Sequence, residues 1–471
     1  MNMQQNNPVS LRSLILATGN VSSHVLAGHD SRATWSELAH GSVLQGEPEL
    51  QGRSVLVATS HQFSSAAALI ELDGVARRIV LFPPDVPREH LAYVAKTSEA
   101  DALITDQPEI ASMPHGIGNV VLCGRSVAPA DRDRSARIQT EWILLTSGTT
   151  GLPKLAVHTL ASLAGSGWHA GQPPTAVVWS TFYDMRRYGG MHIFLHACIA
   201  GTSMVLSSAH ESTAEFLVRA SAHGVTHISG TPSHWRRALM SPQATRIAPV
   251  YVRMSGEIVD QAILNQVRSQ YPMARVDHTF ASTEAGVGFY VSDGLMGFPP
   301  EVLASNPLIE MKVLDGTLRI RSNRTATRYL GEDTPVLKDS EGFVDTGDTI
   351  ETRDGRCYFA GRRDGIINVG GRKVHPEEVE AVINRHPGVA MSLVRAKKNP
   401  ITGALVIADV VLKNNSSQMI LESEGAAANA QQNDILDFCR TELEPHKVPA
   451  AIHIVSTLSI GESGKLVRRY A

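Results

Sequence analysis

The chain has 471 residues, which is too many for one hydrophobic core, so two or three domains are expected. It carries 43 Lys and Arg against 46 Asp and Glu, a net charge of −3 with neutral histidine, and it has no dense basic cluster. Nucleic acid is therefore not expected as a partner. The N-terminus has no basic segment before a long apolar core, and no later run approaches about 18 apolar residues, so we expect a cytoplasmic protein without integral membrane association.

The four cysteines, Cys123, Cys198, Cys357 and Cys439, lie far apart and form no CxxC pair. This spacing argues against a disulfide framework and against a thiolate zinc site. We expect buried thiols with no special role.

The first part of the chain alternates short apolar runs with stretches compatible with helices. Residues 54–59 and 78–82 are predicted strands, with a predicted helix over 63–75 between them. Further strands are predicted at 176–180, 202–206, 225–230 and 251–255. This alternation predicts βαβ units and parallel sheets, so the fold class is α/β with a large N-terminal domain.

From about residue 309 the pattern changes to short strands joined by tight turns. Residues 310–322 and 349–361 each contain Asp-Gly between extended segments, which is a strong hairpin signal. They predict a small antiparallel β subdomain over about 309–361, at the end of an N-terminal domain of residues 1–363.

The remaining residues, 364–471, are predicted to form a small α+β domain. A helix is expected over about 376–385, because Pro376 suits a first helical turn and Glu377 and Glu378 suit its positive end. Residues 413–434 are polar and rich in small side chains, which predicts a loop or a weakly ordered insertion.

A polar, glycine-rich loop, TSGTTGLPK, occupies residues 146–154 directly after an apolar run. Exposed backbone N–H groups beside hydroxyls and a lysine suit an anion with many oxygens, and phosphate is the first candidate. A Walker A loop needs G-x-x-x-x-G-K followed by Ser or Thr, whereas Gly148, Gly151 and Lys154 are three apart and Leu155 follows. The loop is therefore not that of a P-loop NTPase.

The TSGTTGLPK loop resembles that of the adenylate-forming superfamily, which comprises acyl-CoA synthetases, aryl-CoA ligases, luciferases and the adenylation domains of peptide synthetases. Other segments are similar to motifs of this family and occur in the family's order: FASTEAG at 280–286, FVDTGD at 343–348, GRRDGIINVGGRKVHPEEVE at 361–380 and GESGKLVRR at 461–469. The resemblance extends from about residue 30 to the C-terminus. It implies that the C-terminal domain, from residue 364 onward, is mobile.

The resemblance implies roles for residues around the phosphates of ATP. Contacts to the nucleotide are expected from the loop residues Thr146, Ser147, Gly148, Thr149, Thr150, Gly151 and Lys154. Phe280 is expected to pack on adenine, Thr283 to contact phosphate, and Glu284 to hold Mg²⁺. Phe280 stands where the family more often has Tyr, and Ala281 replaces a common Gly. A hydroxyl beside a carboxylate suits a hard cation that prefers oxygen ligands.

The later motifs imply the rest of the site. Asp348 and Arg362 are expected at the ribose, Asp364 at the hinge, and Lys465 at the reacting carboxylate. Lys465, together with Lys154 and Glu284, makes up the expected catalytic set. Lys154, Lys465 and the Mg²⁺ expected on Glu284 would offset the repulsion between a carboxylate and the phosphates.

The implied reaction has two steps: a carboxylic acid and ATP give an acyl-adenylate and pyrophosphate, and a thiol then displaces AMP. Coenzyme A is the preferred thiol, with Gly370 and Gly371 expected near its pantetheine arm after the C-terminal domain rotates. A stand-alone adenylation enzyme that loads a separate carrier protein presents the same phosphopantetheine arm and stays an alternative. A catalytically silent nucleotide-binding relative is disfavoured, because the functional residues of all these motifs are retained.

The identity of the acid does not follow from the motifs. Many acyl-CoA and aryl-CoA ligases have a His in the region matched by residues 180–192, and this chain has arginines there. We expect Arg186, Arg187, Tyr188 and Gly256 near the acyl pocket. A buried arginine needs an anionic or strongly polar partner, which is either Asp184 or a second polar group on the acid. An amino acid is disfavoured, because Asp184 lies about four residues too early to match the family's amine-binding Asp.

His192 and His196 have the helical spacing of zinc ligands, but Ile193 stands where a metalloprotease helix needs Glu. We expect these histidines to lie in the core or to line a pocket.

Overall fold

The structure is a computed structural model of the chain. It describes residues 8–19, 21–46, 48–113, 115–130, 134–146, 151–165, 177–332, 334–400, 402–413, 426–461 and 465–466. No helix among these residues combines the length and the apolar character needed to cross a bilayer. The four cysteines are free and buried, as expected.

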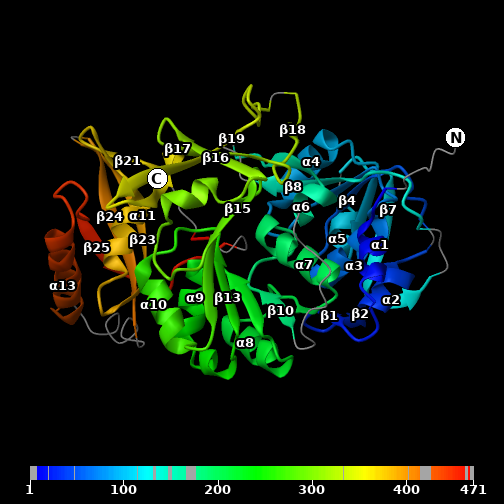
Figure 1. Cartoon of the computed structure of the whole chain (residues 1–471), viewed down its shortest axis with the longest axis horizontal. Coiled ribbons are helices and arrows are strands. Elements are labelled where there is room, and N and C mark those ends of the chain that lie inside the picture. The colour runs from blue at the N-terminus through cyan, green and yellow to red at the C-terminus, as the bar shows by residue number, and fades with distance from the viewer. Residues whose placement is uncertain are drawn as a thin grey trace.

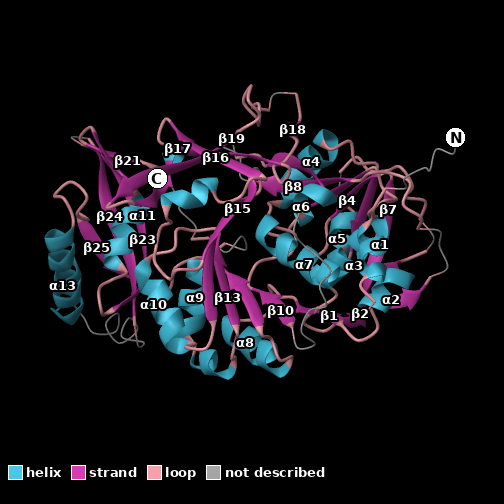
Figure 2. Ribbon diagram, viewed as in Figure 1, coloured by secondary structure: helices cyan, strands magenta, loops and turns pink. Residues whose placement is uncertain are grey.

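Two eight-stranded, mostly parallel sheets form the N-terminal part (Figure 2). The first sheet has the order β15 (Gly286–Val291), β14 (Arg275–Ser282), β13 (Tyr251–Ser255), β12 (His227–Gly230), β10 (Val178–Thr181), β11 (Ser203–Val205), β1 (Val25–Ala27) and β2 (Arg32–Thr34). The second has the order β18 (Arg328–Leu330), β9 (Lys154–Thr159), β8 (Glu141–Thr146), β5 (Arg78–Leu81), β4 (Ser54–Val57), β6 (Ala102–Thr105), β7 (Asn119–Pro129) and β3 (Gly41–Leu44). The predicted α/β class with parallel sheets is confirmed.

Helices pack on both sheets. They are α1 (Leu11–Ala17), α2 (Trp35–His40), α3 (Gln62–Leu72), α4 (Leu91–Thr97), α5 (Pro108–Ala111), α6 (Leu160–Ala164), α7 (Tyr188–Ala200), α8 (Thr213–Ala222), α9 (Pro232–Met240) and α10 (Gln261–Gln270). Short 3₁₀ turns occur at Arg88–His90, Pro242–Arg246, Pro300–Ala304 and Arg363–Gly365. Helices α3 and α7 are apolar around most of their circumference, which is the pattern of a helix enclosed on all sides. Their side chains join one core cluster with strands of both sheets.

A four-stranded antiparallel sheet follows, with the order β16 (Ile309–Leu314), β17 (Thr317–Ser322), β19 (Val344–Arg353) and β20 (Arg356–Arg362). Asp315 and Asp354, in the two Asp-Gly turns, adopt positive φ angles of 51° and 48°. The predicted antiparallel sheet is confirmed, and both hairpins turn where the sequence indicated.

The C-terminal part comprises β21 (Ile367–Val369), β22 (Arg372–Val374), α11 (Pro376–Ile383), β23 (Val389–Asn399), β24 (Gly403–Leu412), α13 (Ala426–Glu442) and β25 (Ala451–Ile454). It has its own core cluster, as expected for an α+β unit. The exact domain boundary at 363/364 stays a prediction. The loop expected over 413–434 is wrong in its second half: α13 starts at Ala426, since a run of alanines favours helix and Ile435 and Cys439 are buried one turn apart. Residues 414–425 lie outside the described residues.

The parts follow one another along the long axis of the molecule (Figure 1). The sheet that contains β4 and β7 lies at one end, the sheet that contains β13 lies in the middle, and the C-terminal elements β21 to β25 lie at the other end. Because strands β10, β12, β13 and β14 are parallel, their carboxyl ends share one edge. Ligand sites of α/β folds lie at such edges.

Candidate active site

The predicted phosphate loop connects two paired strands. Strand β8 ends at Thr146, and Thr146 pairs with Lys154 at the start of β9. The hydroxyl of Thr146 is buried and has no hydrogen-bond partner among the residues that the structure describes. Ser147, Gly148, Thr149 and Thr150 lie outside the described residues, and Gly151 has a φ of +85°. A buried, unsatisfied hydroxyl beside a lysine fits an oxyanion at this turn.

Lys154 and Glu284 meet around one tyrosine. The Lys154 ammonium lies 5.4 Å from the ring centre of Tyr329 on β18, and the Tyr329 hydroxyl donates to Glu284 Oε1 over 3.1 Å. Burial and the Glu284 charge raise the pKa of Tyr329, so the phenol stays a donor. A cation and a carboxylate thus lie close to the phosphate turn, which is the donor set that a magnesium–phosphate complex requires.

The segment around Thr283 is anchored from two sides. His158 Nε2 donates to the Thr283 carbonyl over 2.8 Å, and burial lowers the pKa of His158 to about 4, so the ring is neutral. Phe280 stacks on Phe359 with ring centres 5.0 Å apart and 14° between planes, and on Phe289 at 5.8 Å. Phe280 is half-buried, and its contact with adenine stays a prediction.

Asp348 and Arg362 face each other across the β19–β20 pair. Arg362 Nη1 lies 3.9 Å from Asp348 Oδ1, and the other Arg362 nitrogen lies 4.0 Å from Asp364. Burial raises the pKa of Asp348, while the charges of Arg362 and Lys465 oppose the rise. The Asp364 side chain is 67% exposed within the 3₁₀ turn that leads into the C-terminal part.

Lys465 reaches this site from the far end of the chain. Leu466 N donates to Glu257 Oε1 over 3.0 Å, and Ser233 N donates to the other oxygen of Glu257. Gly256 has a φ of +88°, and a Cβ at Gly256 would lie 3.8 Å from Lys465 Cε. The C-terminal segment is therefore fastened at Glu257, with Lys465 directly over Gly256.

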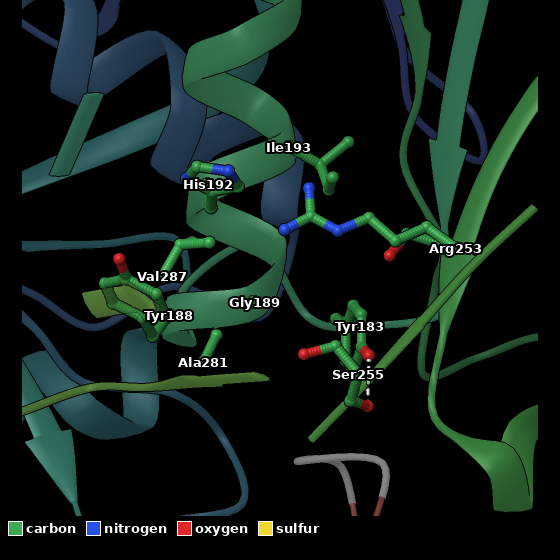
Figure 3. Close-up of a pocket in the computed structure, with 10 residues that line it drawn as sticks. Tyr183, Tyr188, Gly189, His192, Ile193, Arg253, Ser255, Ala281 and Val287 are labelled. Carbon is green, nitrogen blue, oxygen red and sulfur yellow. Dashed lines mark hydrogen bonds between the residues drawn. The ribbon is translucent and has the colours of Figure 1, made fainter. Parts of the chain in front are cut away.

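A pocket opens beside Gly256, between α7 and the carboxyl ends of the central strands (Figure 3). Its lining residues are Tyr183, Tyr188, Gly189, His192, Ile193, Ser229, Arg253, Ser255, Ala281 and Val287. The Tyr183 hydroxyl donates to the Ser255 carbonyl over 2.6 Å, which fixes one aromatic wall.

Sequence reasoning missed Arg253, which projects from β13 into this pocket (Figure 3). Arg253 is only 6% exposed. A basic residue inside an apolar strand of a parallel sheet was the signal that could have identified it. His192 lies on the pocket wall and His196 packs on Trp179 with ring centres 4.9 Å apart, as expected for core or pocket-lining histidines.

Two residues expected near the acyl pocket lie elsewhere. Arg186 is fully buried and pairs with Asp184 and the Thr59 carbonyl. Arg187 donates to the Leu145 carbonyl over 3.0 Å and to Asp85 over 2.6 Å. Both point toward the second sheet because they precede α7, where the chain crosses between the sheets. Neither arginine therefore lines this pocket, whereas Tyr188 lines it and Gly256 adjoins it.

Gly370 and Gly371 form the turn between β21 and β22, with φ angles of +57° and +83°. Gly371 lines an open surface groove with Asn368, Thr402 and Gly403. This groove is separate from the pocket at Gly256, so the two glycines and Lys465 occupy different places in this conformation.

Residues 74–326 match the AMP-binding enzyme family, and residues 378–465 match the AMP-binding enzyme C-terminal domain. The chain belongs to the AMP-binding enzyme family. The predicted membership of the adenylate-forming superfamily is thereby confirmed.

Relatives of this AMP-binding enzyme include CoA ligases. A 2-succinylbenzoate–CoA ligase of Salmonella typhimurium is 29% identical over 76% of this chain and 75% of its own length. A 4-hydroxybutyrate–CoA ligase of Metallosphaera sedula is 27% identical over 69% of this chain and 60% of its own length. Among solved structures, the anthranilate CoA ligase AuaEII in complex with anthranoyl-AMP covers 97% of this chain and 95% of its own, with a TM-score of 0.79 and 17% identity. That likeness supports the fold.

Proposed function

We propose that this AMP-binding enzyme is an ATP- and Mg²⁺-dependent acid–thiol ligase that activates a carboxylic acid as its acyl-adenylate and transfers the acyl group to coenzyme A. The observation that carries the proposal is the position of Lys465 over Gly256, between the acid pocket and the residues expected at the nucleotide. The CoA-ligase relatives support the choice of thiol.

In the first step a carboxylate oxygen attacks the α-phosphorus of ATP and pyrophosphate leaves. Two anions must approach each other, so the Lys465 ammonium would neutralise the carboxylate and the bridging oxygen in the transition state. Lys154 and the hydroxyl of Thr146 would hold the departing phosphates. Glu284 would hold Mg²⁺, which supplies positive charge to the phosphate oxygens.

The nucleoside would lie along the first sheet and the antiparallel sheet. Phe280, already stacked on Phe359, offers a further aromatic face to adenine, and the Thr283 hydroxyl lies beside the anchored carbonyl. Asp348 would accept hydrogen bonds from the ribose hydroxyls, with Arg362 balancing its charge. Burial of Asp348 favours such a neutral hydroxyl partner.

In the second step the thiol sulfur attacks the acyl carbon and AMP leaves. Lys465 occupies the approach to that carbon here, so the C-terminal part would turn about Asp364 and bring the Gly370–Gly371 turn to the site. The exposed Asp364 side chain, and a glycine turn at which an added Cβ would meet no atom within 4 Å, are compatible with this rotation. The phosphopantetheine arm of a carrier protein could use the same route. The experiment below therefore compares coenzyme A with a carrier protein as the acyl acceptor. Since ATP and coenzyme A are the reactants, we place the enzyme in the cytoplasm.

A pyrophosphate-release screen tests the proposal. Aliphatic, aromatic, hydroxylated and dicarboxylic acids are each supplied with MgATP, with and without coenzyme A. At least one acid should give pyrophosphate, and AMP and the acyl-CoA should follow only with the thiol. If coenzyme A never accelerates turnover while a phosphopantetheinylated carrier protein does, the acyl acceptor is the carrier protein and not coenzyme A. Absence of acid-dependent pyrophosphate release would contradict the ligase itself.

A further inference from the structure

Five arginines in the described part of the chain are buried, and four of them pair with a carboxylate. The four pairs are Arg78 with Glu141, Arg134 with Glu71, Arg186 with Asp184, and Arg236 with Asp260. Arg253 makes no ion pair with any residue that the structure describes. A buried guanidinium without a counter-charge is costly, so this one stands out within the same molecule.

We infer that Arg253 is the specificity-determining residue of the pocket, and that it pairs with a second carboxylate of the substrate, at the end away from the reacting group. The preferred substrate is then a compact dicarboxylic acid. This inference rests on the proposed function, since it names the class of acid that the proposed ligase activates.

The position of Arg253 on its strand fits the far end of such an acid. Arg253 and Ser255 point to the same face of β13, and Gly256 follows beneath Lys465. At about 3.3 Å per residue, the Arg253 backbone lies roughly 10 Å below Gly256 along the strand. An acid whose reacting carboxylate meets Lys465 therefore extends toward the Arg253 guanidinium.

The pocket ends just below Arg253. In strand register, Ser229 lies beside Arg253, and the next residues down are His227 and Tyr251. The rings of Trp179, His227 and Tyr251 pack together there, with ring centres 4.8 to 5.8 Å apart. This aromatic floor leaves no continuation for a long alkyl chain.

The carboxylate beside Arg253 on the sheet already has other hydrogen-bond partners. Asp277 lies beside Arg253 in register on β14, but it accepts from Arg275 Nε over 3.0 Å, from Arg275 Nη2 over 2.8 Å and from the Tyr251 hydroxyl over 3.2 Å. The described contact of the Arg253 guanidinium is the ring of Tyr290, 4.8 Å away. A neutral ring covers one face of the guanidinium and leaves its N–H edges for an anion.

The remaining walls of the pocket are mostly apolar or aromatic. Ala281, Val287 and Ile193 are apolar, and Tyr183 and Tyr188 add aromatic faces. His192 completes the far end of the pocket beside Arg253 (Figure 3). Burial and the Arg253 charge hold the pKa of His192 well below its usual value, so this imidazole is neutral. Arg253 is thus the one cation among the described lining residues.

Matched acids and variants test the inference. The acids are benzoate with benzene-1,2-, 1,3- and 1,4-dicarboxylate, and butanoate with butanedioate and pentanedioate. In the unmodified enzyme, kcat/KM for one diacid should exceed that of its monoacid by about 100-fold, because a buried polar group that loses its partner rejects the analogue strongly. Arg253→Gln should lower kcat/KM for that diacid about 100-fold, mainly through KM, and change the monoacid less than about threefold.

Two further variants separate specificity from structure. Arg253→Lys keeps the charge and should recover part of the activity with the diacid. Arg246→Gln, at an exposed position outside the pocket, should leave kcat/KM unchanged for both the diacid and the monoacid. The melting temperature of Arg253→Gln should not fall, since the substitution removes an uncompensated buried charge. Monoacids as the best substrates, or equal losses on both acids with a lowered melting temperature, would overturn the inference.

Binding measurements distinguish this failure from failure of the proposed ligase. Each diacid is titrated calorimetrically into the unmodified protein and into Arg253→Gln without ATP. Tighter binding of a diacid by the unmodified protein supports the inference even if no acid is turned over, which would contradict the ligase alone. Equal binding of every diacid by both proteins overturns the inference while leaving any measured ligase activity standing.

Discussion

The two halves of the site are built differently. The residues expected at the nucleotide lie on turns and strand ends, and several are open to solvent, such as Arg362 with 55% of its side chain exposed. The acid pocket is formed by regular elements, and Arg253, His192 and Tyr188 are each less than a tenth exposed. The open half can change its contacts as the C-terminal part turns, while the enclosed half is held by the packing of regular elements.

This difference separates two kinds of effect. Substitutions in the open half should alter the chemistry equally for every acid. Substitutions in the enclosed half should alter which acid is used. Lys465 and Gly256 lie at the border, so a defect there should remove the first step altogether.

The largest effect is expected for Lys465→Ala. Removing the one described cation over Gly256 should lower adenylation about 1,000-fold for every acid, as removal of a transition-state charge partner does. Thioester formation from a supplied acyl-adenylate should persist, because Lys465 must leave before the thiol arrives. Single-turnover assays of each half-reaction measure this, with Lys398→Ala, an exposed lysine of β23, as the control. Equal losses in both half-reactions would show that Lys465 also serves the second step.

A smaller loss, about 50-fold, is expected for Glu284→Gln, which replaces an anionic magnesium ligand by a neutral one of the same shape. The loss should shrink as MgCl₂ is raised, and it should be the same for a monoacid and a diacid. The rates of both enzymes are measured in a magnesium titration at fixed ATP. If the magnesium dependence matches that of the unmodified enzyme, Glu284 does not hold the metal.

Arg187→Met should raise KM for ATP about tenfold whichever acid is present. Arg187 ties Asp85 to the Leu145 carbonyl, directly before Thr146, so its loss should loosen the strand that enters the phosphate turn. Initial rates over a grid of ATP and acid concentrations separate the two constants. A rise in KM for the diacid alone would place Arg187 with the pocket after all.

The smallest effect, about threefold, is expected for Tyr329→Phe. The ring under Lys154 remains, and only the hydroxyl that donates to Glu284 is lost. Activity of the double variant Tyr329→Phe with Glu284→Gln should equal that of Glu284→Gln alone, since the hydroxyl acts through that carboxylate. Additive losses would assign Tyr329 a separate contact.

Candidates for the open half could be named from the sequence because its residues occur in short contiguous motifs. Thr146 and Lys154 belong to one hairpin, and Thr283 and Glu284 to one strand end, so short motifs place them together. The two sheets followed from the alternation of apolar runs with helices. Helix α13 was missed in part, because polar composition hides a helix whose few buried positions depend on the sheet beneath.

The enclosed half was not predictable in the same way. Arg186 and Arg253 are both buried arginines, yet one pairs with Asp184 and the other faces the pocket. Only the order of the strands shows that Asp277 lies beside Arg253, and this carboxylate is already paired with Arg275. Both ion pairs join residues two positions apart, but the neighbour relation between Arg253 and Asp277 joins two different strands, so no local pattern reveals which charge is left without a partner.

The most direct test of the account follows the oxygen of the acid. The best acid of the screen is labelled with ¹⁸O in its carboxyl group and turned over with MgATP and coenzyme A. If a carboxylate oxygen attacks the α-phosphorus beneath Lys465, one ¹⁸O should appear in AMP, the acyl-CoA should keep the other, and pyrophosphate should carry none. Label in pyrophosphate or inorganic phosphate, or AMP without label, would contradict an acyl-adenylate and with it the site described above.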